Sequence, residues 1–190
     1  KREEFNAFLR RKAQNSIVRR AALLIFLNKT CFNGLYRVNS QGEFNVPFGR
    51  YKNPTVCNEE NLYAVNDLLQ KAEIFCGDFA ECLKDVDDGS FVYFDPPYRP
   101  ISATASFTSY SKDAFDDQEQ KRLRYVYGEL DIKGASVMLS NSDPKNNDPD
   151  DDFFDDLYRG YHIERLNATR LINCNAERRG SITEILVMNY

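Results

Sequence analysis

The first part of the chain combines a helical pattern with an irregular segment that is rich in side-chain chemistry. Apolar residues recur at helical spacing from Phe5 to Asn28, and no proline or glycine interrupts them. This pattern predicts two helices or one bent helix. From Thr30 to Pro54 the spacing is lost, and Gly, Asn, Pro and aromatic residues take its place. That composition indicates an ordered loop or a short hairpin.

From Asn58 onward, short apolar segments alternate with helical ones. Asn58 is a good N-cap for a helix that ends near residue 71. Strands are expected at 73–77, 90–94 and 135–140, and further helical segments at 79–83, 115–130 and 152–158. A closing antiparallel pair is expected at 161–166 and 182–189. The alternation favours an α/β fold with an open sheet, whose ligands bind at the carboxyl ends of the strands.

Composition limits the fold and the available chemistry. With 190 residues, 42% of them hydrophobic, the chain can fill one substantial core and a small helical annex. No apolar run approaches the roughly 20 residues of a membrane span, and the start is unlike a secretory signal, so a cytoplasmic protein is expected. The five cysteines form no CxxC pair, and His162 is the single histidine. We therefore expect no disulfide framework and no metal site, and catalysis by carboxylates, backbone groups and aromatic rings.

Charge is distributed unevenly along the chain. Residues 1–56 contain eleven Lys or Arg and three Glu, a net charge of +8, so the remainder carries −12 of the total of −4. A basic lobe beside an acidic body is typical of a protein that binds a polyanion, because Lys and Arg contact phosphates. The alternative is a helix with a solvated basic face.

The strongest chemical signal follows the apolar strand expected at 90–94. It consists of Asp95, Pro96, Pro97 and Tyr98. The two prolines have fixed φ and no N–H, so they form a stiff segment that presents carbonyl acceptors. Asp95 adds a negatively charged acceptor and Tyr98 an aromatic face. An open α/β sheet places its reactive groups at this position.

Phe94–Tyr98 resembles the motif of amino-group DNA methyltransferases. Segments 32–39, 42–52, 103–110 and 139–143 resemble, in the same order, blocks of the Dam-type (D12 class) adenine-N6 methyltransferases. The resemblance covers nearly the whole chain. It implies a bacterial or phage-encoded enzyme, of restriction-modification or related systems, that transfers methyl from S-adenosyl-L-methionine to adenine in double-stranded GATC sites. It also implies a Rossmann-like α/β sheet, with a small helical target-recognition lobe at 1–56 and the catalytic domain at 57–190.

The resemblance implies a mechanism for Asp95–Tyr98. The amino nitrogen of adenine is a poor nucleophile, and Asp95 and the carbonyl of Pro96 would accept its two N–H bonds and return electron density to it. Tyr98 would stack on the base after it is flipped out of the duplex. Asp95 is also expected near the methionine moiety of the cofactor. Phe79 is expected beside the cofactor's adenine, with Asp78 as an alternative polar contact.

Seven residues of the basic lobe match family positions that contact DNA. They are the guanine-reading Arg37, the hydrogen-bonding Asn33, the wedge Phe32, the apolar base contacts Leu35 and Pro47, and Arg50 and Tyr51 at the backbone or the outer base. An arginine fork suits guanine because it can pair with O6 and N7 in the major groove. For each residue, the alternative is a role in holding its own turn.

The chain also departs from the family pattern. The N-terminal cofactor motif and Gly-rich turn of relatives have no counterpart before Asp95, which predicts a truncated chain or one piece of a split enzyme, with an exposed apolar sheet edge. Two other functions stay open. One is cytosine-N4 transfer, although such relatives usually have Ser at the position of Asp95, and the other is a DNA-binding module without catalysis.

Overall fold

In the computed structural model, the described residues are 1–11, 17–100, 115–169 and 181–190. They form two compact units, Lys1–Phe75 and Cys76–Tyr190, each with a hydrophobic core of its own. The first unit includes the helix after residue 58, whereas the lobe expected from charge ends at residue 56. The family block expected at 103–110 lies outside the described residues.

The first unit is built on two helices, as the apolar spacing predicted. They are α1 (Arg2–Arg11) and α2 (Ile17–Thr30), followed by the short 3-10 helix η2 (Phe32–Gly34) and by α3 (Glu59–Leu69). Asn58 caps α3, because its side chain accepts a hydrogen bond from the Asn61 amide at 3.0 Å. Six residues form the core: Phe5, Leu23, Leu27, Cys31, Phe44 and Val46.

The loop after α2 doubles back on itself as a short hairpin. Isolated bridges join Cys31 to Phe48 and Val38 to Phe44, both antiparallel. Asn6 on α1 holds the returning segment of this loop: its side-chain amide donates to the carbonyl of Phe44 at 3.2 Å and accepts from the amide of Phe44 at 2.8 Å. The Asn6 side chain therefore satisfies both the N–H and the C=O of Phe44, as a neighbouring strand would in a sheet.

We expect Asn6→Ala to destabilise the chain by about 1–3 kcal/mol, because both buried backbone groups of Phe44 lose their partner. Chemical denaturation followed by circular dichroism measures the change. Asn66→Ala, on the exposed surface of α3, is the control and should stay within about 0.5 kcal/mol of wild type. Equal stability of Asn6→Ala and wild type would contradict this account of the loop.

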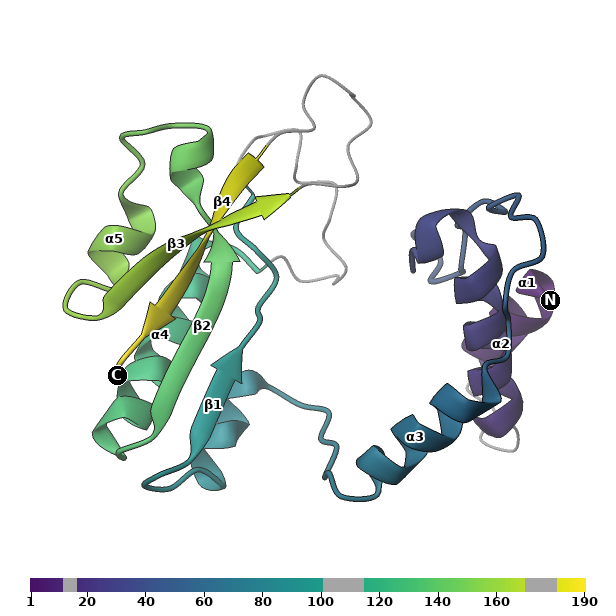
Figure 1. Cartoon of the computed structure of the whole chain (residues 1–190), viewed down its shortest axis with the longest axis horizontal. Helices are drawn as coiled ribbons and strands as arrows, with labels where there is room; N and C mark the ends of the chain where they lie inside the picture. Colours follow the sequence, from purple (N-terminus) through teal and green to yellow (C-terminus); the bar gives the residue numbers. More distant parts are fainter. Residues whose placement is uncertain (12–16, 101–114, 170–180) are drawn as a thin grey trace. The chain divides into compact units, whose positions relative to one another are not determined.

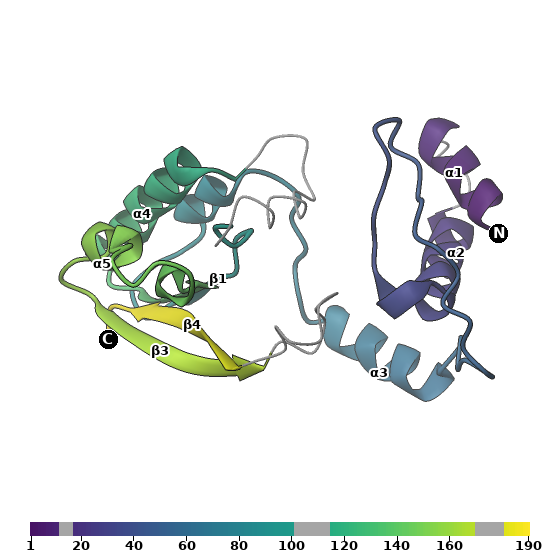
Figure 2. The same cartoon turned by 90° about the horizontal axis from the view of Figure 1, so that it is seen from above.

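The second unit is a four-stranded sheet with helices packed on one face (Figures 1 and 2). Strand order is β1-β2-β4-β3, with β1 and β2 parallel and the other neighbours antiparallel. The strands are β1 (Phe91–Phe94), β2 (Ser136–Ser142), β3 (His162–Thr169) and β4 (Ser181–Met188). The helices are η3 (Phe79–Lys84), α4 (Asp117–Ile132), η5 (Pro144–Asn146) and α5 (Phe153–Leu157). This mixed α/β architecture and the closing antiparallel pair agree with the sequence predictions.

The core of this unit lies between the sheet and helices α4 and α5. Val137 and Leu139 of β2 pack with Leu123 and Tyr127 of α4, and all four are fully buried. The hydroxyl of Tyr127 donates to the carbonyl of Val137 at 2.9 Å. Burial of its ring raises the pKa of that hydroxyl. The contact fastens α4 to the strand beside β1.

The strand expected at 73–77 does not form. Residues 73–76 have no regular structure, and Ile74 and Phe75 are 76% and 77% exposed. A strand needs a neighbour for its backbone groups, and among the described residues none pairs with this segment. The prediction was wrong because an apolar pattern alone does not supply that partner.

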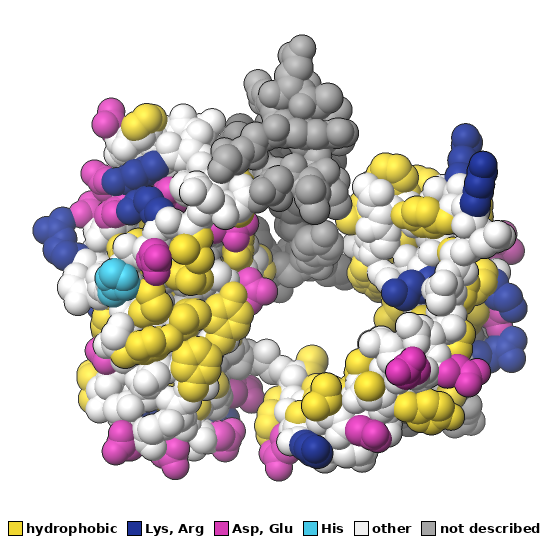
Figure 3. Space-filling view, viewed as in Figure 1, with side chains coloured by type: hydrophobic (Ala, Val, Ile, Leu, Met, Phe, Trp, Pro, Cys, Tyr) yellow, Lys and Arg dark blue, Asp and Glu magenta, His cyan; other side chains and the backbone are white. Residues whose placement is uncertain are grey.

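Strand β1 forms an edge of the described sheet. Phe91 and Tyr93 on it are 60% and 52% exposed, and apolar side chains gather on the sheet face seen in Figure 3. These exposures fit the expected apolar edge. Among the described helices, none is long and apolar enough to cross a membrane.

Candidate functional site

The segment Asp95–Tyr98 leaves the carboxyl end of β1, as expected for an open α/β sheet. Because β2 runs parallel to β1, the end of β2 reaches the same edge. Ser140 of β2 is 4% exposed, and its hydroxyl donates to Asp95 Oδ1 at 3.2 Å. The hydroxyl of Tyr93 donates to Ser140 at 2.8 Å. These bonds orient the exposed carboxylate of Asp95 through one oxygen.

Tyr98 lies at the surface of the same edge. The residue is 37% exposed, and its hydroxyl donates to Glu184 Oε2 at 3.5 Å. Burial of part of the ring raises the pKa of the hydroxyl. Part of this aromatic side chain is thus left accessible for stacking.

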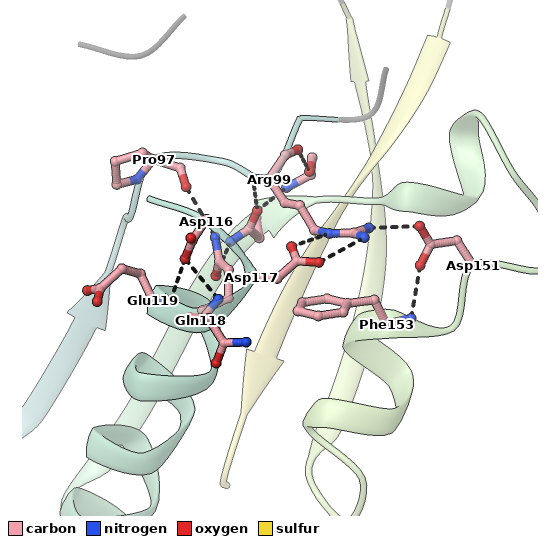
Figure 4. Close-up of polar contacts among 11 residues, drawn as sticks. Pro97, Arg99, Asp116, Asp117, Gln118, Glu119, Asp151 and Phe153 are labelled. Carbon is pink, nitrogen blue, oxygen red and sulfur yellow. Dashed lines mark hydrogen bonds and ion pairs between the residues drawn. The ribbon is translucent and has the colours of Figure 1, made fainter. Parts of the chain in front are cut away.

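Arg99 anchors the end of this segment (Figure 4). Its guanidinium donates to Asp117 Oδ1 at 2.8 Å and to Asp151 Oδ2 at 2.7 Å, and it lies 4.3 Å from the centre of the Phe153 ring. Burial alone would raise the pKa of Asp151, but the hydrogen bonds from Arg99 and from the amide of Phe153, together with the positive charges of Arg99 and Lys145, outweigh it and the pKa is lowered. Helix α4 and the start of α5 thus hold the chain directly after Tyr98.

The proposed cofactor contacts Asp78 and Phe79 lie at the start of η3 beside Arg122 of α4. Asp78 accepts from both terminal nitrogens of Arg122, at 2.9 and 2.7 Å, and from the amide of Ala80 at 2.9 Å. The hydrogen bond from Arg122 lowers the pKa of Asp78 to about 2. The same guanidinium lies 4.0 Å from the centre of the Phe79 ring. Asp78 is therefore already engaged, whereas Phe79 is partly exposed.

The seven expected DNA-contacting residues all lie on the first unit and are all exposed. They are Phe32, Asn33, Leu35, Arg37, Pro47, Arg50 and Tyr51. The structure brings several together, since the amide of Phe32 donates to the carbonyl of Pro47 at 2.8 Å and that of Asn33 to the Tyr51 hydroxyl at 2.9 Å. Asn33 and Arg50 have positive φ, 53° and 56°. Phe44 and Val46 are buried beneath this surface.

Arg37 is held in a defined orientation. Its Nε donates to Asn45 Oδ1 at 2.8 Å and its Nη2 to the carbonyl of Asn45 at 3.4 Å. The amide of Asn45 in turn donates to the carbonyl of Arg37 at 3.0 Å. Asn45 thus restrains one edge of an exposed guanidinium. Lys and Arg side chains also lie on the surface of this unit in Figure 3.

Sequence reasoning missed the residues that support these groups. Ser140 and Asn141 lie within the recognised block 139–143, but their roles were not assigned. Gln120 was missed altogether, although it lies on the face of α4 that carries Leu123 and Tyr127 and is fully buried. A polar residue on the apolar face of a helix was the available signal.

Comparison with known proteins agrees with this mixed α/β fold. The family model for D12 class N6 adenine-specific DNA methyltransferases matches residues 1–172. The chain therefore belongs to this family of adenine-specific DNA methyltransferases.

Three curated relatives illustrate the similarity. The chain is 51% identical over 190 residues to the type II methyltransferase M.MjaIII of Methanocaldococcus jannaschii, covering 100% of this chain and 63% of the relative. It is 44% identical over 177 residues to the type II methyltransferase M1.LlaDCHI of Lactococcus lactis subsp. cremoris, covering 92% and 60%. It is 37% identical over 187 residues to the DNA adenine methylase of Escherichia coli (strain K12), covering 98% and 62%. The chain thus spans about three-fifths of the length of these relatives.

Proposed function

We propose that this chain is the DNA-reading and catalytic part of an enzyme that methylates N6 of adenine in duplex DNA, at GATC sites, with S-adenosyl-L-methionine as the donor. The observation that carries the proposal is the exposed Asp95 carboxylate at the carboxyl end of β1, oriented by Ser140 and followed by Pro96, Pro97 and Tyr98. Family membership and the names of the relatives support adenine as the target. The GATC site rests on the resemblance of segments 32–39 and 42–52.

In this mechanism the adenine is flipped out of the duplex and stacks on Tyr98. Its amino group donates one N–H to Asp95, through the oxygen that Ser140 does not bind, and the other to the carbonyl of Pro96. Both acceptors draw density onto the nitrogen as positive charge develops there, which is electrostatic stabilisation by preorganised groups. Neither the stacking of the base nor the activation of its amino group requires a metal ion.

The residues present fit the proposed donor. Asp95 is exposed, so its carboxylate can also lie near the amino group of the methionine moiety. Phe79 is partly exposed, with Arg122 4.0 Å from the centre of its ring and the Phe115 ring 5.9 Å away, and its exposed part would contact the adenine of the donor. The pairing of Asp78 with Arg122 gives it less freedom to bind a ligand. When bound, S-adenosyl-L-methionine supplies an electrophilic methyl group on its sulfonium.

Residues 1–56 are the proposed target-recognition lobe, and 57–190 the catalytic domain. Arg37, restrained by Asn45, would read a guanine by a fork of two hydrogen bonds in the major groove. The net charge of +8 over residues 1–56 would supply sequence-independent affinity for phosphates. The alternative proposal is a DNA-binding fragment without catalysis, which the same charge and exposed loop favour.

Transfer of labelled methyl to duplexes with and without GATC tests both proposals. The assay uses the chain alone and the chain supplied with an N-terminal segment from a relative. Label confined to GATC adenine, in either form, supports the enzyme. Duplex binding without label in both forms supports the DNA-binding fragment, and absence of both label and binding overturns both proposals.

A further inference from the structure

A buried polar cluster lies beneath the catalytic segment, on the side facing the protein core. It consists of Gln120 on α4 and of Asn141 and Ser142 at the end of β2, which are 0%, 0% and 8% exposed. The large majority of polar side chains buried this deeply make hydrogen bonds. Here those bonds are made to the segment that follows β1.

Gln120 connects the segment to the sheet. Its Nε2 donates to the carbonyl of Pro97 at 3.3 Å, and its Oε1 accepts from Asn141 Nδ2 at 3.2 Å. Asn141 Oδ1 accepts from the amide of Arg99 at 2.9 Å. The side chains of two separate elements therefore hold backbone groups on both sides of Tyr98.

Ser142 and the Arg99 side chain complete the attachment. The hydroxyl of Ser142 donates to the carbonyl of Arg99 at 2.6 Å. The guanidinium of Arg99 pairs with Asp117 and Asp151 (Figure 4). The chain at Pro97 and Arg99 is thus bonded to β2, to α4 and to the loop before α5.

We infer that Gln120, Asn141 and Ser142 are positioning residues for methyl transfer, which hold Pro97 and Arg99 and thereby fix the Pro96 carbonyl and Asp95. This inference rests on the proposed function. The fixed φ angles of Pro96 and Pro97 make the segment stiff, so a shift at Pro97 is passed on to the groups before it. Gln120 bonds the carbonyl of Pro97, which leaves the Pro96 carbonyl to the adenine. A misplacement of about 1 Å in such a site can lower the rate about 100-fold.

Gln120→Met tests the inference, because methionine keeps the shape of the side chain and removes both hydrogen bonds. In the form of the enzyme that methylates DNA, kcat should fall about 10- to 100-fold, the size expected from misplaced reacting groups. KM for DNA and for S-adenosyl-L-methionine should be unchanged. Ser142→Ala removes one hydroxyl only, and a smaller fall in kcat is expected. If Gln120→Met does not fold, the kcat of Ser142→Ala tests the positioning role instead.

Hydrogen exchange supplies a readout that does not depend on activity. In a peptide spanning 95–100, the three prolines have no amide hydrogen, so Tyr98 and Arg99 dominate the signal. Exchange at these amides in the full chain should rise about tenfold in Gln120→Met, the order expected when one hydrogen bond is weakened. Tyr127→Phe is the matched control, since it removes another buried hydrogen bond between α4 and β2 without touching the segment.

The outcomes separate this inference from the proposed function. Slower turnover and faster exchange in Gln120→Met, both absent in Tyr127→Phe at equal loss of thermal stability, support the positioning role. Wild-type kcat and exchange in Gln120→Met overturn it, as do equal losses in both variants. If wild type transfers no methyl, the proposed function fails, and exchange alone decides whether the cluster holds the segment.

Discussion

Asp95→Ala is expected to reduce methyl transfer by about 10²–10³-fold, the usual loss when one preorganised electrostatic contact to the reacting group is removed. The adenine amino group would lose the charged acceptor of one of its N–H bonds. Duplex affinity should stay within about twofold, because affinity for DNA comes mainly from Lys and Arg contacts to phosphates. Transfer of labelled methyl at saturating substrates, together with a gel-shift titration, measures the two quantities separately.

Two variants control for the loss of a surface carboxylate. Asp156→Ala removes an exposed acid on α5 that pairs with Arg159, and wild-type transfer is expected. Asp95→Asn keeps the shape and one acceptor oxygen but no charge, so its rate should lie between those of Asp95→Ala and wild type. Methylation by Asp95→Ala at the wild-type rate would eliminate the mechanism proposed for this site.

Arg37→Ala is expected to cost about 1–3 kcal/mol of discrimination for the outer guanine of the target, the value of one bidentate arginine–base contact. The restraint that Asn45 places on the guanidinium lowers the entropy lost on binding, which favours the upper part of this range. The measurement is the ratio of kcat/KM for a GATC duplex to that for a duplex with this guanine replaced by adenine.

Arg37→Lys separates charge from geometry. Lysine retains the positive charge but has no planar fork, so nonspecific duplex affinity should be kept while the discrimination is lost. Arg37→Ala should also lower nonspecific affinity, with a weaker dependence on salt. If both variants discriminate as well as wild type does, another residue reads this base.

Many elements of the fold could be predicted from local sequence. The apolar spacing of residues 5–28 predicted helices, and α1 and α2 form there. The expected strands at 90–94 and 135–140 appear as β1 and β2 with small changes at their ends. The strand expected at 73–77 did not form, because a strand depends on a neighbour that no local pattern specifies.

For the candidate site, the sequence predicted the reactive groups but not the residues that hold them in place. Asp95 was placed correctly at the end of β1, since a short apolar run followed by two prolines is a local signal. Ser140, which orients its carboxylate, is 45 residues away in the sequence. Gln120 is 23 residues from Pro97, and Asn45 meets Arg37 only because the intervening loop turns back.

The sequence by itself thus determined the α/β class, the family and the order of the chemical groups along the chain, because periodicity and motifs are properties of neighbouring residues. Only the tertiary structure decided which side chains hold those groups in place. Asn6 binds the backbone of Phe44 across 38 residues, and Gln120 joins Asn141 to Pro97. Such contacts form when separate elements pack and buried polar groups take the partners that the fold brings within reach.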